Sequence, residues 1–281
     1  FVGGYDTPGR AFDVHVRDNL AYIADEWKLI ILNVANPFNP TLVSETITAG
    51  HAEDVQTSGN LAYVADAMGG VITYDVSDPS SPTKLGTLDT PGISYNLAID
   101  GGKLLIADGP SFVIARQNSP GRLEVLGTYP DASWGHGFVR RGTIGYLAGG
   151  GGLHTLDLTS ETAPVQLHLA LMHDWAVSPF LDGNRLYVAA FPFGVHIFDI
   201  SDPTSPVLRT SYKTVGGVRR VYVENDLAYV TDDYIDDTQD LSQLLILDVS
   251  EPTSPTVRGR RPFKGRAWNL HKDGDYVYMV D

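Results

Sequence analysis

The residues best suited to chemistry stand near the start of seven equivalent segments, where histidine, arginine and tryptophan replace one another. His51 and Glu53 are two residues apart, so on a strand both side chains point to the same side. A histidine beside a carboxylate can act as a general acid or base. With His136 they form the candidate catalytic group of a lyase or hydrolase acting on an anionic substrate. No cysteine and no Gly-x-Ser-x-Gly nucleophile motif accompany them.

A second group of residues in these segments is suited to binding rather than to catalysis. Arginine clamps carboxylates and sulfates through paired hydrogen bonds, and tryptophan and tyrosine supply apolar contact area. Repeated positions that serve only the fold should be alike in every segment, whereas these differ, so we expect a binding surface. The alternative is that the tryptophans fill a channel and the arginines are solvated at its mouth. The candidate ligand-binding residues are Arg10, Trp27, Tyr95, Trp134, Trp175, Arg219, Arg220, Arg266 and Trp268.

Two metal sites are conceivable, and neither has a complete motif. His51, His136 and His173 could converge from separate segments on a tetrahedral site, although no closely spaced histidine pair supports it. The acidic segment 232–240 could bind calcium, which takes several carboxylate oxygens, but the EF-hand spacing and its glycine are missing. The alternative is a solvated acidic loop. We predict no cofactor and keep calcium as the open possibility. The candidate calcium ligands are Asp232, Asp236, Asp237 and Asp240.

A repeat of about 40 residues positions these side chains. Each copy contains four short runs of β-branched and aromatic residues between turn clusters, which predicts a four-stranded meander. The second run carries a recurrent phrase, for example NLAYVAD. Its copies are Asn19–Asp25, Asn60–Asp66, Lys103–Asp108, Ile144–Gly149, Arg185–Ala190, Asp226–Asp232 and Tyr276–Asp281.

The repeats predict an all-β fold, a single seven-bladed β-propeller with four-stranded antiparallel blades. Residues 2–9 match the fourth-strand segment 85–92, so the N-terminal strand is expected to complete the C-terminal blade and close the ring. The last copy stops after its second strand, and we expect the natural chain to continue past Asp281. The expected blades are 10–48, 49–91, 92–130, 131–171, 172–214, 215–263, and 264–281 together with 1–8.

The third run of the repeat carries a family resemblance. It reads VITYDVSDP at Val71–Pro79, VHIFDISDP at Val195–Pro203 and LLILDVSEP at Leu244–Pro252. These units resemble the LVIVD-repeat family of β-propellers, over essentially the whole chain and least at 114–117. Members are typically bacterial or archaeal proteins that are exported or attached to the cell surface. The resemblance therefore implies an extracellular, periplasmic or cell-surface location. It implies no single activity.

The amino-acid composition limits the classes of partner that we expect the protein to bind. The formal net charge is −14 and the pI about 4.8, which argues against nucleic acid and anionic membrane surfaces. No apolar run is long enough to span a membrane. We expect an exported or cell-surface module that binds a protein, a glycan or a small anionic ligand at an aromatic and arginine-rich rim of the central channel. The alternatives are an enzyme at the same rim and a structural subunit of a surface complex.

Overall fold

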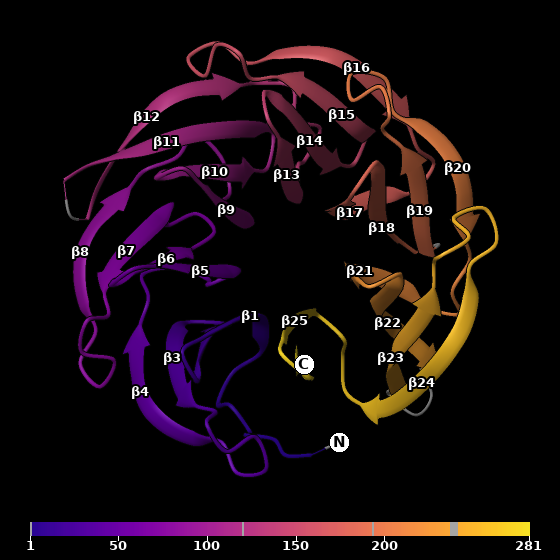
Figure 1. Cartoon of the computed structure of the whole chain (residues 1–281). Helices are drawn as coiled ribbons and strands as arrows, with labels where there is room; N and C mark the ends of the chain where they lie inside the picture. The colour runs from indigo at the N-terminus through magenta and orange to yellow at the C-terminus, as the bar shows by residue number, and fades with distance from the viewer. Residues whose placement is uncertain (1, 120, 193, 237–240) are drawn as a thin grey trace.

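The computed structural model describes residues 2–119, 121–192, 194–236 and 241–281, which form six four-stranded sheets and one two-stranded sheet. Figure 1 shows these sheets arranged radially around a central opening. In each four-stranded sheet the strands are antiparallel neighbours in sequence order. The first strand faces the opening and the fourth lies outermost (Figure 1).

The strand bounds follow the repeat. Blade 1 contains β1 (Ala11–Arg17), β2 (Leu20–Asp25), β3 (Lys28–Asn33) and β4 (Thr41–Ile47). Blade 2 contains β5 (Asp54–Ser58), β6 (Leu61–Ala65), β7 (Val71–Asp75) and β8 (Thr83–Leu88). Blade 3 contains β9 (Asn96–Asp100), β10 (Lys103–Asp108), β11 (Ser111–Ser119) and β12 (Arg122–Tyr129). Blade 4 contains β13 (Gly137–Arg141), β14 (Ile144–Gly149), β15 (Gly152–Asp157) and β16 (Val165–Leu171).

Two further blades and a hairpin complete the ring. Blade 5 contains β17 (Trp175–Asp182), β18 (Arg185–Phe191), β19 (Gly194–Asp199) and β20 (Val207–Tyr212). Blade 6 contains β21 (Gly217–Glu224), β22 (Leu227–Asp236), β23 (Leu241–Asp248) and β24 (Thr256–Lys264). The hairpin contains β25 (Asn269–Asp273) and β26 (Tyr276–Val280). Among the residues described, no helix is long and apolar enough to cross a membrane.

The prediction of seven four-stranded blades was wrong, because the structure has six. The remaining sector of the ring holds only the two-stranded sheet of β25 and β26. The expected closure by an N-terminal strand was also wrong, since residues 2–10 form no strand. An outer fourth strand needs a third strand to pair with, and the sheet of β25 and β26 has only two strands. The N-terminal segment instead packs on blade 1, where Gly9 N–H donates to the Asp25 carboxylate at 3.0 Å.

The hairpin closes the ring through contacts with blade 1. Val280 packs in one apolar cluster with residues of β1, β2 and β3, and half-buried Trp268 and Tyr278 lie against it. Ala11 N–H donates to the Asp281 carbonyl at 3.2 Å. The Asn269 side chain donates to the buried Asp13 carboxylate at 2.6 Å. Apolar packing and a buried hydrogen bond therefore join the hairpin to blade 1.

The core lies between adjacent blades. The second strand of each complete blade is buried on both faces because it is central in its sheet and both sheet faces pack on neighbours. In the cluster between blades 1 and 2, for example, Tyr22 and Ile31 pack against Val55 and Val64. Radial stacking thus buries apolar faces that one meander alone would leave in water.

The motif at the end of the third strand forms a turn. The Asp75 carboxylate accepts the backbone N–H of Ser77, and Asp78 accepts that of Ser80. Asp199, Asp202 and Asp248 make the same two-residue contact. Aspartate stabilises such turns by bonding backbone two residues ahead. These repeated carboxylates serve the fold.

In blades 1, 2, 3 and 6, a second recurrent aspartate ties the loop before the first strand to the end of the second strand. Its carboxylate accepts the backbone N–H of a glycine sixteen residues earlier. The pairs are Gly9 with Asp25, Gly50 with Asp66, Gly92 with Asp108 and Gly216 with Asp232, at N–O distances of 3.0, 2.5, 2.7 and 2.8 Å. An added Cβ at Gly50 would lie 2.5 Å from the Asp66 carbonyl oxygen, so the loop approaches too closely for a side chain. We call this pair the Asp–Gly clamp.

Candidate functional site

The candidate residues gather at one end of the channel, which we call the channel mouth. Here the loop before each first strand meets the loop that follows the second strand of the preceding blade. Ala52 N–H donates to the Glu26 carbonyl at 2.6 Å, and Gly135 N–H donates to the Gly109 carbonyl at 2.7 Å. These bonds place Trp27, on the β2–β3 loop, at the same end as His51.

Side chains at or just before the starts of the first strands form the inner ring of the mouth. The Tyr95 ring lies 5.0 Å from the His136 ring, and His136 stacks on Trp175 with centroids 6.2 Å apart. Burial lowers the pKa of His136, and the Arg219 charge lowers it further. His136 is therefore held neutral, as a hydrogen-bonding group rather than as a cation.

His51 is enclosed by aromatic rings and a carboxylate. Its ring lies 4.7 Å from the Phe12 ring and 5.6 Å from the Trp27 ring, both edge-on. Its Nδ1 lies 3.0 Å from Glu53 Oε1. Burial raises the pKa of Glu53, whereas the adjacent His51 opposes this shift. The two groups lie close together next to apolar surface, as an acid or base requires, but in the described structure His51 Nδ1 has no hydrogen-bond partner.

Two arginines share one buried carboxylate beside Trp268. Arg219 Nε donates to Asp233 Oδ2 at 3.0 Å, and Arg266 forms an ion pair with the same oxygen at 3.2 Å. The Arg219 guanidinium lies 4.0 Å from the centroid of the Trp268 ring and 5.1 Å from that of Phe191. Burial lowers the pKa of Arg219, and the Asp233 charge opposes this. The planar groups are therefore held in place before any ligand arrives.

Arg220 lies deeper in the channel than Arg219. Its guanidinium donates to Ser178 Oγ at 3.3 Å and acts electrostatically on Asp13 and Asp54. Burial raises the pKa of Asp13, and raises that of Asp54 well above its usual value with help from the Asp13 charge. The structure thus places Arg220 as a counterion inside the channel, below the mouth.

The other three tryptophans surround the mouth and reach solvent. Trp27 and Trp134 are each 54% exposed and Trp175 is 60% exposed. Arg10 is exposed near the same end. The alternative prediction was that the tryptophans fill the channel. It does not hold for these three side chains, because each is more than half exposed.

The acidic segment contributes structure where it can be described. Asp232 is fully buried, and its carboxylate accepts from Gly216 N–H and from the Gln243 amide at 2.7 Å. Asp237 and Asp240 lie outside the described residues, and the side chain of Asp236 does too. Within the described part of the chain, no cluster of three or more metal-ligating side chains is present. Calcium binding at this segment stays a prediction.

The sequence did not indicate Asp233 as the carboxylate between the two arginines, nor Phe191 and Phe12 as the ring neighbours of Arg219 and His51. Asp233 follows the recurrent Asp232, which drew attention to turn chemistry instead. Phe191 and Arg219 are far apart in sequence, so only the packing of blades 5 and 6 joins them. When the repeats are aligned, Phe12 of blade 1 is equivalent to Glu53 of blade 2 and Tyr95 of blade 3. This equivalence was the only feature of the sequence that indicated Phe12.

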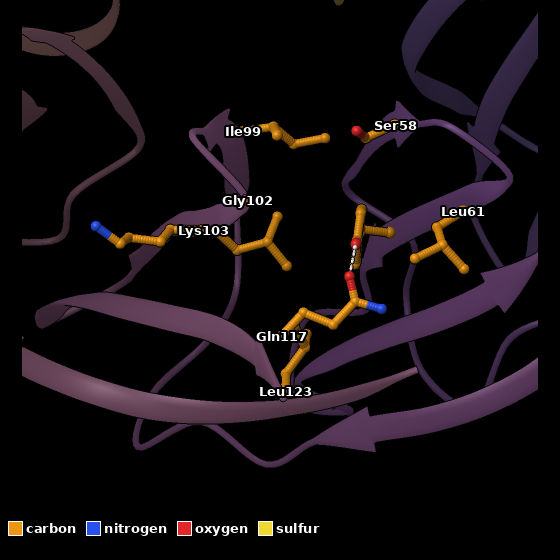
Figure 2. A pocket seen from close by; sticks show the side chains of 9 residues that line it. Ser58, Leu61, Ile99, Gly102, Lys103, Gln117 and Leu123 are labelled. Atoms are coloured by element: carbon orange, nitrogen blue, oxygen red, sulfur yellow. Dashed lines mark hydrogen bonds between the residues drawn. The ribbon is translucent and has the colours of Figure 1, made fainter. Parts of the chain in front are cut away.

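A separate cleft between blades 2 and 3 is too small for a substrate. Figure 2 shows its lining, which includes Ser58, Ile99, Lys103 and Gln117, with Gln117 joined to Tyr63 by a hydrogen bond of 3.1 Å. Its volume is about 80 Å³. Ligand pockets are typically roughly 300–1,000 Å³, so the cleft has room for a few waters.

Comparison with known families identifies the repeat. The LVIVD repeat model matches residues 8–48, 49–90, 177–214 and 215–261, more than half of the chain. The chain belongs to the LVIVD-repeat family. The family resemblance seen in the sequence is thereby confirmed, and the unmatched region covers blade 3, blade 4 and the C-terminal hairpin.

Solved structures of low sequence identity share the propeller fold. A protein from Lactobacillus plantarum is 14% identical with a TM-score of 0.76, the match covering 89% of this chain and 84% of that chain. A chain of a mitotic checkpoint complex is 16% identical with a TM-score of 0.76, covering 95% and 83%. A functionally unknown protein from Desulfotomaculum acetoxidans is 12% identical with a TM-score of 0.72, covering 91% and 86%. No curated protein matches this chain. Identities this low establish the fold alone.

Proposed function

We propose that this LVIVD-repeat protein is a binding module whose channel-mouth face docks a protein partner. The observation that carries the proposal is a set of exposed, large apolar side chains around the mouth. Four lie in its loops and three at the adjoining strand ends. They are Trp27, Ile47, Met68, Trp134, Leu171, Trp175 and Val215. At the opposite end of the propeller, the described loops expose Phe38 and the adjoining strand ends expose residues that include Val165, Val207 and Tyr276, but no tryptophan is exposed there.

The composition of the face favours a protein over a small ligand. Exposed apolar residues that are distributed around several blades match a wide contact surface better than a single sugar or anion. Tryptophan and arginine dominate the energetics of protein interfaces. The polar centre of the mouth, with His51, Glu53 and Arg219, offers directional hydrogen bonds to a side chain of the partner.

Peptide selection tests this proposal. Peptides selected from a random library on the immobilised protein should bind at the mouth, and their Kd can be measured by titration. Trp27→Ala and Trp175→Ala should each raise Kd by about tenfold or more, as expected for interface tryptophans. Phe38→Ala is the matched control, because Phe38 is 66% exposed but lies at the opposite end. Binding that tolerates both tryptophan variants, or that Phe38→Ala weakens equally, would contradict a docking face at the mouth.

A lyase or hydrolase at the same mouth is the second candidate, favoured by the 3.0 Å contact of His51 with Glu53 and the raised pKa of Glu53. Burial that raises the pKa of a carboxyl favours its protonated form, which a general acid needs. The test is turnover of anionic esters and glycosides by the protein and by Glu53→Gln. Turnover that the variant abolishes would favour the enzyme.

We further propose that the protein acts outside the cytoplasm or at the cell surface. Membership of the LVIVD-repeat family supports this, since members are typically exported. Fractionation of the native host with an antibody against the protein tests it. Recovery only with cytoplasmic markers would refute it.

A further inference from the structure

We propose that Asp174, His196 and Ser211 form a hydrogen-bonded tether that positions Trp175 for binding at the channel mouth. The inference rests on the proposed docking function, whose contact surface includes Trp175. The three residues come from the loop before β17, from β19 and from β20. They lie outside the ring of candidate residues that the sequence indicated.

The tether satisfies both nitrogens of one imidazole. His196 Nε2 lies 2.9 Å from Asp174 Oδ2, and His196 Nδ1 lies 2.6 Å from Ser211 Oγ. An ionised carboxylate only accepts, so Nε2 carries the hydrogen that Asp174 receives. In the neutral ring Nδ1 then accepts from the Ser211 hydroxyl. The chain of bonds therefore has one direction, from the outer strand to the mouth loop.

Burial strengthens the bond between His196 and Asp174. Asp174 is 8% exposed, and the side chain of His196 is nearly as buried. A hydrogen bond to a charged group that is shielded from water is worth more than an exposed one. Loss of His196 would leave a buried carboxylate without this donor, so the loop would rearrange to reach water.

The tether replaces the Asp–Gly clamp in blade 5. In the clamped blades, glycine occupies the loop and aspartate ends the second strand sixteen residues later. In blade 5 the loop position is Asp174 and the strand position is Ala190. The carboxylate is therefore on the loop, and the second strand has none at this position. His196 on the third strand provides the anchor instead. The departure occurs directly before Trp175.

A histidine at this strand position does not require an acid partner. His154 occupies the equivalent position of β15 in blade 4, opposite Leu147 as His196 is opposite Val188. His154 Nδ1 bonds the Gln166 side chain at 2.7 Å, and within the described structure its Nε2 has no hydrogen-bond partner. In blade 4 the mouth-loop Asp131 acts on His154 through its charge, whereas in blade 5 the mouth-loop Asp174 forms a direct hydrogen bond with His196.

The tether acts on the mouth through the backbone. Asp174 is joined to Trp175, whose indole stacks on His136 with an interplanar angle of 21°. Holding the Asp174 side chain limits the freedom of the next residue. An exposed tryptophan that is ordered before binding loses less entropy when a partner contacts it.

Fluorine NMR of protein containing 5-fluorotryptophan tests the tether without a partner. The four tryptophans give separate signals that single Trp→Phe variants assign. His196→Ala and Asp174→Ala should shift and broaden the Trp175 signal, with the Trp27 signal unchanged. Asp174→Asn keeps an acceptor oxygen for Nε2–H and should restore the original signal. His154→Ala is the matched control and should leave Trp175 unaffected.

Peptide affinity then connects the tether to docking. The His196→Ala variant should raise the Kd of a mouth-binding peptide by about threefold to tenfold, the range expected when one side chain must be ordered on binding. If His196→Ala does not fold, Ser211→Ala serves instead, because exposed Ser211 can be replaced at the surface and should shift the same fluorine signal less.

The outcomes separate the two proposals. An unchanged Trp175 signal in both His196→Ala and Asp174→Ala would overturn the tether and leave docking intact. Unchanged peptide affinity in Trp175→Ala would refute docking through this residue, while the fluorine result would still decide the tether. Serine, histidine and aspartate also form hydrolytic triads. Stoichiometric labelling of Ser211 by a fluorophosphonate would overturn positioning in favour of a nucleophile.

Discussion

His15 should make the protein sensitive to mild acid. It lies on β1 inside the channel, with its ring 5.0 Å from that of His271. Burial, followed by the charge of His271, lowers the pKa of His15 from 6.5 to about 4. The folded protein therefore binds fewer protons than the unfolded chain between these values. Stability is full above the unfolded pKa and is lost as the pH falls through this window.

The size of the effect follows from the shift. A difference of one pKa unit corresponds to about 1.4 kcal/mol, so His15 accounts for at most roughly 3 kcal/mol. Between about pH 7.5 and pH 4.5, His15→Gln should lose about 2 kcal/mol less free energy of unfolding than the parent protein. His136 and His154 shift in the same direction, but they are present in both proteins and cancel in the comparison. His271 lies 5.0 Å from His15, so the difference reports the titration of this histidine pair.

Urea unfolding at the two pH values measures this difference. His168→Gln is the control, since His168 lies on the outer strand β16, away from the channel. The control should lose as much stability in acid as the parent protein. Equal losses in His15→Gln and the parent would refute the reasoning, because they would mean that His15 in the folded channel titrates as it does in the unfolded chain.

Three further predictions concern the buried carboxylates. Asp108→Ala should lower the free energy of unfolding by about 1–3 kcal/mol in urea titrations, because it leaves clamped backbone without an acceptor; no loss would mean that the clamp is dispensable. Asn269→Ala removes a donor from buried Asp13 and should speed amide exchange in the β25–β26 hairpin more than in β10; uniform exchange would argue against a local closure. The free energy of unfolding of Asp54→Asn should rise relative to that of the parent protein as the pH increases above about 4. Burial raises the pKa of Asp54, so ionisation of this carboxyl costs more free energy in the folded protein than in the unfolded chain. A difference in urea unfolding that does not depend on pH would refute this.

The sequence predicted individual strands better than it predicted the ring. Alternating apolar residues and turn clusters are local signals, and the four-stranded antiparallel blades follow from them. Seven copies of the recurrent phrase predicted seven blades, but the seventh copy forms only a two-stranded sheet, and residues 2–9, which resemble a fourth strand, form no strand. Similar residues pair as a strand only beside a free edge, and the two-stranded hairpin provides no third strand.

The candidate site was predictable to the extent that the repeat aligns its residues. Equivalent positions on the first strands had to lie near the channel, so Tyr95, His136 and Arg219 could be grouped before any contact was known. Their partners could not be found in this way. Asp233 reaches Arg266 across 33 residues, and Asp174 reaches His196 across 22, between elements that only packing brings together.

By itself the sequence determined the repeat, the turn chemistry and the family, because each depends on hydrogen bonds and burial within a single meander. The tertiary structure alone decided how the ring closes, which arginine faces the mouth and which lies in the channel, and where blade 5 exchanges its clamp for a histidine. These outcomes depend on contacts between blades. A side chain on one blade is neutralised, buried or exposed by residues that its own repeat does not contain.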